Sequence, residues 1–431
     1  MFSFAPEKSI FFGKPFFYGW TVLFLVCCVG FVRAAPAVAT LSIFVTPMID
    51  SFGWSRLSMS GAVSLGGVLA ALTSPIIGSL MDRHGPRVIL ISAVTLTGLS
   101  CISLSFINNL FFFYLAFCIA RMNFAGPFDL GIYGAINNWF VRRRLFATSI
   151  ANLSQTLGLA LIPLIASTAI LWGSWRTGWI IIGLLVYCVG LIPAFLLRIP
   201  RPESIGLLPD GIIRNTSESS TTKKVETENF EPEFSRSDAL RTKTFWLLSL
   251  FTLLVFPVQA GVSLHQAPHL LQQGLSASEA AIIVSLFSTS AACMTLLTGV
   301  FGKKISISFF LFLSGVAMSV STFLMLSINS LWDGLTSGII FGASLGAILT
   351  LLPLAWADFF GRKNYGAIRG IALTIQVVSQ ALGPVISGLM WDLDGNYFGA
   401  LKVYTAFAFF ASGLVLFAHP PKRLYREKKI L

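Results

Sequence analysis

The sequence predicts an all-α membrane protein with twelve transmembrane helices in two pseudo-symmetric halves of six. Composition is the first observation: 55% of the 431 residues are hydrophobic and only 11% are charged, whereas soluble proteins carry about 25% charged residues. A membrane helix needs roughly 20 mostly apolar residues, so about twelve spans would use on the order of 240 residues, close to the hydrophobic share. Stretches such as 180–197 are apolar on every face, which excludes the alternating pattern of a transmembrane β-barrel.

Apolar runs of membrane-spanning length follow one another along the chain. We predict spans at about 17–46, 56–80, 87–107, 110–137, 146–171, 176–198, 244–271, 277–300, 305–327, 332–357, 367–390 and 397–418. The first run is much longer than the core of a signal peptide, so we expect it to be retained as the first span. All six cysteines fall inside these runs, where Cys behaves as a small hydrophobe, and we expect no disulfide and no metal site.

One long hydrophilic stretch divides the spans into six and six. It is rich in Ser, Thr, Glu and Lys and has few bulky apolar residues, a composition typical of linkers. The predicted organisation is therefore an N-terminal half at 1–199, a cytoplasmic linker at 200–243 and a C-terminal half at 244–431.

The net charge of +12 is distributed in a way that predicts orientation. With both termini inside, most of the 30 Lys and Arg residues lie on the cytoplasmic side, and the outer loops hold only Arg56, Arg176 and Lys402. This asymmetry is what the positive-inside rule requires. The lipid bilayer is therefore a sufficient partner to explain the excess of basic residues, and we expect no nucleic-acid partner. Short loops without large outer domains favour a bacterial cytoplasmic membrane, and we expect a monomer.

An internal repeat supports the two halves. The turn between spans 4 and 5 reads NNWFVRRRLFATSIANLSQTLGLALIP, and the turn between spans 10 and 11 reads ADFFGRKNYGAIRGIALTIQVVSQALGP. Both give an aromatic pair, a basic turn, and then an apolar helix that ends in Gly and Pro. A weaker similarity relates GSLMDRHGPR after span 2 to GVFGKK after span 8. Two parallel six-helix repeats are typical of a large class of secondary transporters.

The loop after span 2 carries a specific motif. Gly78, Asp82, Arg83, Gly85 and Arg87 stand in the pattern G-x-x-x-D-R-x-G-x-R, which resembles the loop 2–3 motif of the major facilitator superfamily. The Gly173-Ser-Trp-Arg176 turn is similar to an external turn of the same family. Glycines allow close helix packing and a tight turn, and the charged residues could pair with helix ends on neighbouring spans. We expect these five residues to act as a conformational latch.

Within that superfamily the chain most resembles the monocarboxylate-transporter and oxalate/formate-antiporter branch. The similar segments are Tyr18-Gly19-Trp20, Phe140–Arg144, Pro209-Asp210-Gly211, Leu264–Leu270 and the region from Gly361 to Pro384. The main departure from the branch concerns a basic residue. The branch places one deep in span 8 or span 11, whereas here spans 8 and 9 carry no basic residue and Arg369 lies near the cytoplasmic end of span 11.

Two arginines near the middle of spans are candidate substrate cations. Arg33 lies in span 1, and Arg121 lies in span 4 two residues before Asn123. An ionisable residue at this depth costs several kcal/mol unless it faces the bundle or a water-filled cavity. Because a guanidinium can bond both oxygens of a carboxylate, we expect one of them, Arg33 before Arg121, to bind an anionic substrate. The alternative is an arginine that snorkels or packs on backbone carbonyls.

Asp129 is the carboxylate well inside a span. Two roles compete for it: a protonation site for proton coupling, since burial raises the pKa of a carboxyl, or a fixed partner in the latch. Arg87 or Arg142–Arg144 could reach it from the cytoplasmic side. We favour the latch and keep proton coupling as the alternative.

Polar residues at helical spacing complete the candidate site. His265 and His269 lie one turn apart near the outer end of span 7, where a proton or substrate site is plausible because His titrates near neutral pH. Gln376 and Gln380 in span 11 and Gln155 in span 5 could line a central cavity or simply bond between helices. We expect Asn123, His265 and the three glutamines to contact substrate and both histidines to take part in proton coupling.

The chain carries no Walker loop, G-x-S-x-G elbow or H-E-x-x-H helix, so an enzyme or an ATP-driven pump has no chemical support. We therefore expect a secondary transporter without cofactors that moves a small organic anion, coupled to protons or to exchange, as the resemblance implies. The alternatives are an exporter of larger amphipathic compounds in the same superfamily and a solute sensor that does not transport.

Overall fold

The computed structural model describes residues 10–11, 14–15, 17–199, 201–205, 207–211 and 232–421. Within these ranges the chain is nearly all helical, with 11 helices long and apolar enough to cross a membrane and two shorter apolar helices that share the first crossing. The predicted twelve-span helical fold is confirmed. Three predicted basic or hydrophilic regions lie outside the described residues: Lys8, the linker stretch 212–231, and the basic residues from Lys422 to Lys429.

The N-terminal helices are preceded by a short antiparallel pair, β1 (Ile10–Phe11) and β2 (Lys14–Pro15). The helices are α1 (Gly19–Val32), α2 (Val38–Phe52), α3 (Arg56–His84), α4 (Pro86–Leu104), α5 (Leu110–Ala125), α6 (Pro127–Trp139), α7 (Arg144–Trp172), α8 (Trp175–Leu185) and α9 (Ile192–Leu196). A π-helical turn, Val186–Leu191, joins α8 to α9 within span 6.

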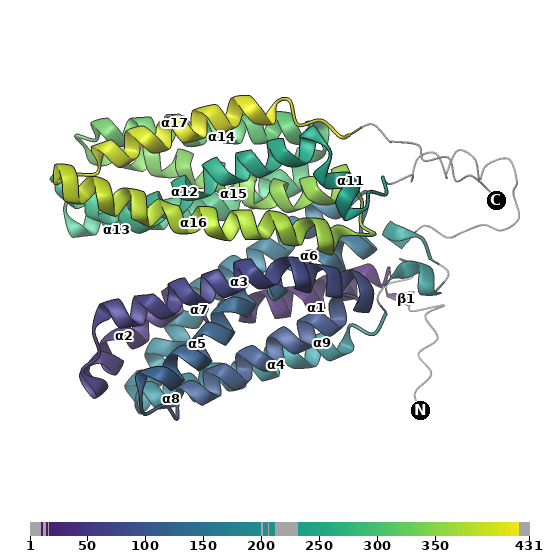
Figure 1. The fold of residues 1–431 in the computed structure, drawn as a ribbon, viewed down its shortest axis with the longest axis horizontal. Helices are drawn as coiled ribbons and strands as arrows, with labels where there is room; N and C mark the ends of the chain where they lie inside the picture. The colour runs from purple at the N-terminus through teal and green to yellow at the C-terminus, as the bar shows by residue number, and fades with distance from the viewer. Residues whose placement is uncertain are drawn as a thin grey trace, which may run out of the picture.

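The C-terminal helices are α11 (Arg236–Leu240), α12 (Lys243–Gln272), α13 (Ala277–Phe301), α14 (Ile307–Leu324), α15 (Leu331–Phe360), α16 (Tyr365–Asp394) and α17 (Phe398–Val415). Figure 1 shows the two sets as two bundles that lie side by side, α12 to α17 above and α1 to α9 below, with α6 where they meet. Every residue of α6 is buried, because α6 packs against α1, α3, α4 and α5 of its own half and also contacts α16 of the other half.

Because successive spans alternate in direction, the molecule has two distinct ends. We call the end where α6 leads into α7 and α15 leads into α16 the linker end; it lies at the right of Figure 1, near α11 and β1. The opposite end, where α7 leads into α8 and α16 into α17, is the distal end.

Two spans that we expected to be continuous are broken near their middles. Span 1 is interrupted at residues 33–37, which include Pro36, and span 4 is interrupted at Gly126, directly before Pro127. Proline lacks the backbone N–H that would continue the helix, and its ring clashes with the preceding turn. Non-helical backbone at membrane depth is tolerated where it is buried in protein or lines a cavity. The two breaks therefore mark the middle of spans 1 and 4 as a candidate site.

The two bundles touch along two pairs of helices, α3 with α16 and α7 with α13. Glycines make both contacts close. A Cβ added to Gly78 of α3 would lie 1.9 Å from the carbonyl oxygen of Gly366 of α16, and one added to Gly299 of α13 would lie 2.2 Å from Oγ of Ser149 of α7. Spans 2 and 11 thus pack as spans 8 and 5 do, which is the relation expected of two repeated halves.

The described parts of the linker lie against turns at the linker end. The Asp210 carboxylate accepts the backbone N–H groups of Val141, Arg142 and Arg143 at 3.0, 2.6 and 3.1 Å. Further along the chain, the amide of Asn364 donates to the carbonyl of Phe234 at 2.7 Å. Each half therefore holds one piece of the linker on its own basic turn.

Candidate functional site

The breaks in spans 1 and 4 face each other, and Arg33 joins them. Arg33 lies directly after α1 and donates from Nε to the carbonyl oxygen of Phe124, in the last turn of α5, at 2.9 Å. Its guanidinium carbon also lies 4.8 Å from the centre of the Phe124 ring. Transporters with repeats of this kind build their binding sites at broken helices near the bilayer midplane. Arg33, which the sequence predicts as a site residue, lies at such a break.

The remaining donors of Arg33 point to two side chains of the same half. One guanidinium nitrogen donates to Oε1 of Gln155 on α7, and another lies 3.8 Å from Oδ2 of Asp129 on α6. The Arg33 side chain is only partly buried. Arg33 is thus held in place by three partners while it keeps some accessible surface.

Asp129 connects the two halves. Its Oδ1 lies 3.4 Å from a guanidinium nitrogen of Arg369 on α16, and that same nitrogen donates to Oε1 of Gln376 at 2.9 Å. Asp129 occupies the first turn of α6, where the helix dipole favours a negative charge. The partners expected from the sequence were wrong: Arg87 instead donates to the carbonyl of Phe195 at 3.1 Å.

Arg369 is the main residue of the site that the sequence does not predict. It lies near the end of its span, yet its side chain is only 1% exposed. The first turn of α16 is buried because α16 packs on α3, so a residue near the helix end still lies within the protein. Its Nε and one terminal nitrogen have no hydrogen-bond partner. The available signal was the seven-residue spacing to Gln376, which places both side chains on one helix face.

A layer of neutral polar groups continues from Gln155. Tyr133 of α6 donates to Oδ1 of Asn152, and Nε2 of Gln155 lies 3.4 Å from the Tyr133 hydroxyl. Asn152 in turn donates to the carbonyl of Leu349 at 3.1 Å and contacts Oγ1 of Thr350 at 3.3 Å, both on α15. This layer is a second hydrogen-bonded link between the halves, beside the Asp129–Arg369 pair.

Arg121 contacts the same aromatic ring as Arg33. Its guanidinium carbon lies 4.5 Å from the Phe124 ring centre, and its Nε is buried without a hydrogen-bond partner. No carboxylate of the described residues pairs with it. Asn123 is not part of this arrangement, because its amide donates to the carbonyl of Ile119 on its own helix at 3.0 Å.

These residues form one group, which we call the central cluster: Arg33, Arg121, Phe124, Asp129, Tyr133, Asn152, Gln155, Arg369 and Gln376. Gln380 lies outside it, paired with Gln259 of α12 at 2.8 Å. The structure therefore brings together four of the predicted substrate residues, Arg33, Arg121, Gln155 and Gln376, and does not bring Asn123 or Gln380 to the same point.

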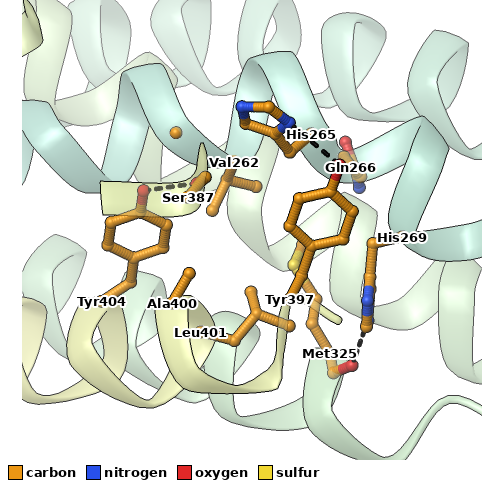
Figure 2. Close-up of a pocket in the computed structure, with 11 residues that line it drawn as sticks. Val262, His265, Gln266, His269, Met325, Ser387, Tyr397, Ala400, Leu401 and Tyr404 are labelled. Atoms are coloured by element: carbon orange, nitrogen blue, oxygen red, sulfur yellow. Dashed lines mark hydrogen bonds between the residues drawn. The ribbon is translucent and has the colours of Figure 1, made fainter. Parts of the chain in front are cut away.

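His265 and His269 lie elsewhere, inside the C-terminal half. They line a small cavity of about 10 Å³ between α12, α16 and α17, shown in Figure 2. Nε2 of His269 lies 2.7 Å from the carbonyl of Met325 and so carries the proton, while Nδ1 of His265 lies 3.3 Å from the Tyr397 hydroxyl. The cavity has room for about one water, which is too small for an organic anion.

The predicted latch residues lie at the linker end. Asp82 accepts the backbone N–H groups of Gly366 and Ala367, at 2.8 and 2.7 Å, in the first turn of α16. Gly85 adopts φ = 83°, a backbone conformation that favours glycine, and Gly78 packs on Gly366. Arg83 is exposed and lines a cavity beside these residues. Of the five residues, Asp82 and Gly78 make contacts between the halves.

Other polar contacts between the halves lie at the same end. Arg144 at the start of α7 pairs with Asp358 of α15, and Arg362 donates to the carbonyl of Asn138 at 2.9 Å. The deepest is the bond from Thr374 to the carbonyl of Ala71 at 2.6 Å. In the part of the chain that the structure describes, the hydrogen bonds that join the halves run from the central cluster to the linker end, so this end is closed.

Comparisons with known proteins agree with this architecture. The model of the Major Facilitator Superfamily matches residues 22–384. The membrane sensor protein UhpC of Salmonella typhimurium is 29% identical over 189 residues, covering 43% of this chain and 42% of that protein. Human monocarboxylate transporter 7 is 21% identical over 434 residues, covering 88% of this chain and 81% of that protein.

A solved structure shows the same fold. The structure of the proton:xylose symporter XylE bound to 6-bromo-6-deoxy-D-glucose has a TM-score of 0.75 at 13% sequence identity, and covers 93% of this chain and 96% of that chain. At this identity the likeness concerns the arrangement of helices alone.

Proposed function

Because the chain belongs to the major facilitator superfamily of transporters, we propose that it moves a small organic anion of the monocarboxylate kind across the membrane by alternating access. The observation that carries this proposal is the central cluster. Three guanidinium groups and one carboxylate lie where spans 1 and 4 are broken and where the two halves meet. A carboxylate is the ligand whose two oxygens match the paired donors of a guanidinium.

The cluster also offers a way to couple binding to movement. Asp129 shares Arg33 with Gln155 and holds Arg369 of the other half. An incoming carboxylate competes with Asp129 for these guanidinium groups and so weakens one of the links between the halves. A ligand shifts a conformational equilibrium only through such a difference in its interactions with the two states. Rocking of the halves then opens the linker end.

Transport of this kind runs by proton coupling or by exchange. Asp129 is our first candidate for the coupled proton, because a proton on its carboxyl group would release Arg369 without a substrate. His265 and His269 remain second candidates, at a distance from the cluster and inside the C-terminal half. Net uptake that acidifies the vesicle interior would indicate coupling, and flux that requires anion on both sides would indicate exchange.

We propose that the linker end faces the cytoplasm of a bacterial cell. The turns at this end hold Arg83, Arg87, Arg142–Arg144, Arg362 and Lys363, and basic residues concentrate on the cytoplasmic side of membrane proteins. Residues 1–199 and 244–431 would then be the moving halves, and 200–243 the cytoplasmic linker between them. We expect the monomer to be the transporting unit.

The test is carboxylate-dependent flux in proteoliposomes. Purified protein is reconstituted, and uptake of lactate, pyruvate, formate and oxalate is measured together with internal pH against uncharged analogues. Arg33→Gln keeps a polar side chain but loses the charge, and we expect a loss of about a hundredfold or more in binding, since it removes one partner of a buried charge interaction. Near-normal flux in Arg33→Gln, with correct insertion, would remove this residue from the site.

A sensor that binds the anion without moving it is the second candidate. The similarity to a protein named as a membrane sensor supports it. Carboxylate binding that depends on Arg33, with no flux in either direction and no exchange, would favour the sensor over the transporter. If no small carboxylate gives binding or flux, the result would instead indicate an exporter of larger amphipathic compounds.

A further inference from the structure

A second and larger cavity, of about 350 Å³, lies at the linker end. Its walls come from the end of α3 and the turn into α4, from α6, from the turn into α16, and from Arg201 at the start of the linker. Gly134 and Tyr365 of the lining are buried, whereas Arg83 and Arg201 are exposed. None of the residues of the central cluster lines this cavity, so it is a separate place in the molecule.

The charged side chains that line this cavity are mainly basic. Arg83, Arg201 and Arg362 supply three guanidinium groups, and Asp82 supplies the one carboxylate of the lining. Asp82 is already engaged by two backbone N–H groups of α16, and the charge of Arg201 acts on it. Arg362 pairs with Glu203. In the described part of the chain, Arg83 and Arg201 form no direct ion pair, so two guanidinium groups remain for a ligand.

Neutral donors in the same lining also lack partners. Gly85 and Pro86 bring the start of α4 to the cavity wall, and this helix has neither a capping side chain nor an acidic residue in its first turn. The free N–H groups and the dipole of such a helix start attract an anion. The hydroxyl group of Tyr365 is buried without a hydrogen-bond partner. Charged and neutral donors therefore indicate a ligand with several acceptor atoms and a negative charge.

We propose that this cavity binds a phosphate group of the monoester class, with the guanidinium groups of Arg83 and Arg201 and the start of α4 as its donors. A phosphate monoester carries a charge of about −1.5 to −2 at neutral pH and three acceptor oxygens. It can therefore use several donors at once, and arginine pairs with phosphate through two parallel hydrogen bonds. The phosphate belongs either to a free phosphorylated metabolite or to a lipid headgroup, and the chemistry of recognition is the same for both.

A ligand in this cavity holds the linker end closed. The lining belongs to both halves and to the linker, so the complete set of donors exists only while the two halves touch. A ligand that binds one conformation better than the other raises the population of that conformation. The phosphate compound thus acts as an inhibitor from the linker-end side, whichever substrate the protein moves.

The experiment uses AMP as the probe and adenosine, which lacks the phosphate, as its control. Affinity is measured with the full-length protein in phosphatidylcholine nanodiscs, and spin-label distances across the linker end report the closed population. We expect AMP to bind about tenfold or more tighter than adenosine, because hydrogen bonds between charged groups distinguish them. AMP should also raise the closed population. Arg201→Gln should lower the affinity for AMP about tenfold.

Two further variants keep the test decisive. Arg201→Lys keeps the charge and should restore part of the affinity, which separates a loss of charge from a folding defect. Arg198→Gln removes an exposed arginine three positions earlier that does not line the cavity, and it should bind AMP as wild type does. Equal binding of AMP and adenosine by wild type, or an equal loss of AMP binding in Arg201→Gln and Arg198→Gln, would overturn the proposal. Loss of AMP binding in Arg33→Gln but not in Arg201→Gln would place the phosphate at the central cluster and overturn it as well.

Phosphatidic acid in the nanodisc distinguishes the two sources of phosphate. If it raises the closed population through Arg201 and competes with AMP, the lipid headgroup is the ligand; if only AMP acts, the ligand is a free phosphate monoester. No Arg201-dependent effect of either compound would overturn the proposal. Because binding is measured without flux, Arg201-dependent binding of AMP together with no carboxylate flux would refute the proposed function alone. Carboxylate flux that neither phosphate compound affects would refute this inference alone.

Discussion

The two helix contacts that close the linker end have the same geometry but different chemistry. Where α3 meets α16, Gly78 lies against the backbone of Gly366, and Asp82 accepts two N–H groups from the first turn of α16. Where α13 meets α7, Gly299 lies against the side chain of Ser149, and Lys303 and Lys304 follow where the other half has its acidic residue. Both helix contacts have the close packing, but only the contact of α3 with α16 has the charged cap.

This difference separates two physical causes of closure. Close packing acts through shape and tolerates no added atom where backbone meets backbone. The carboxylate acts through the unpaired N–H groups and the dipole at a helix start. Because one contact uses both and the other mainly packing, substitutions at equivalent positions can measure each cause by itself. Distances between labels on the two halves at the linker end report the population of the closed state.

The largest effect is expected from a matched pair of glycine substitutions. In Gly78→Ala the new methyl group meets a backbone oxygen at 1.9 Å, which only separation of α3 and α16 can relieve, whereas in Gly299→Ala it meets Oγ and Cβ of the Ser149 side chain at 2.2 and 2.6 Å. Overpacking typically costs about 1–3 kcal/mol and more where nothing can yield. We expect Gly78→Ala to lose the closed linker end in spin-label distance measurements and Gly299→Ala to lose less of it.

The matched control for this pair is Ser149→Gly. This change removes both Oγ and Cβ of Ser149, and the next nearest atom to the new methyl group is then Cα of Phe146 at 3.5 Å, so Gly299→Ala with Ser149→Gly should return to wild-type distances. The same second change should do nothing for Gly78→Ala. If both glycine variants shift the closed population equally, the distinction between a backbone and a side-chain contact is wrong.

The fold and the site differ in how far the sequence predicts them. Twelve spans and the latch motif follow from hydropathy and from the pattern around Asp82, because both depend on local sequence. The breaks in spans 1 and 4 were not predicted, although Pro36 and Pro127 mark them: proline elsewhere, as at Pro163 and Pro353, lies inside unbroken helices. Whether a proline ends a helix depends on packing around it.

The partner of Asp129 shows the same limit for the site. Distance along the chain favoured basic residues of the neighbouring turns, while the actual partner, Arg369, is 240 positions away. Only the packing of the two halves brings these residues together. Arg33 and Arg121 could be chosen from the sequence because a charge in an apolar span is conspicuous by itself; Tyr133 and Asn152 carry no such signal.

A smaller effect is expected for Asp82→Asn, which tests the charged cap. The amide oxygen can still accept one of the two hydrogen bonds, but the amide nitrogen is a donor and cannot accept the other, and the negative charge is lost. Hydrogen bonds to charged groups contribute roughly 1.5–3 kcal/mol against about 1 for neutral ones, so we expect the closed linker end to be destabilised by about 2 kcal/mol. Turnover in proteoliposomes should fall while the Kd for substrate changes little, because Asp82 lies outside the central cluster.

The control for Asp82→Asn uses the other contact. Just after α13 the position four residues beyond Gly299 is Lys303 rather than an acidic residue, so Leu145→Ala on α7, whose side chain packs on Gly302, should loosen packing without any change in the response to salt. The closed population in wild type should decrease with ionic strength more than in Asp82→Asn. Identical salt responses would show that the charge of Asp82 contributes nothing.

The smallest effect is expected at the linker itself. Lys363 pairs with Glu233 at 3.0 Å, but the two side chains are 60% and 62% exposed, and exposed pairs of this kind contribute at most about 0.5 kcal/mol after solvent screening. Lys363→Gln should therefore leave both the closed population and the melting temperature at wild-type values. A clear loss of closure in this variant would mean that the linker near Glu233 restrains the two halves more strongly than this ion pair alone can. Closure would then depend on the linker as well as on the two helix contacts.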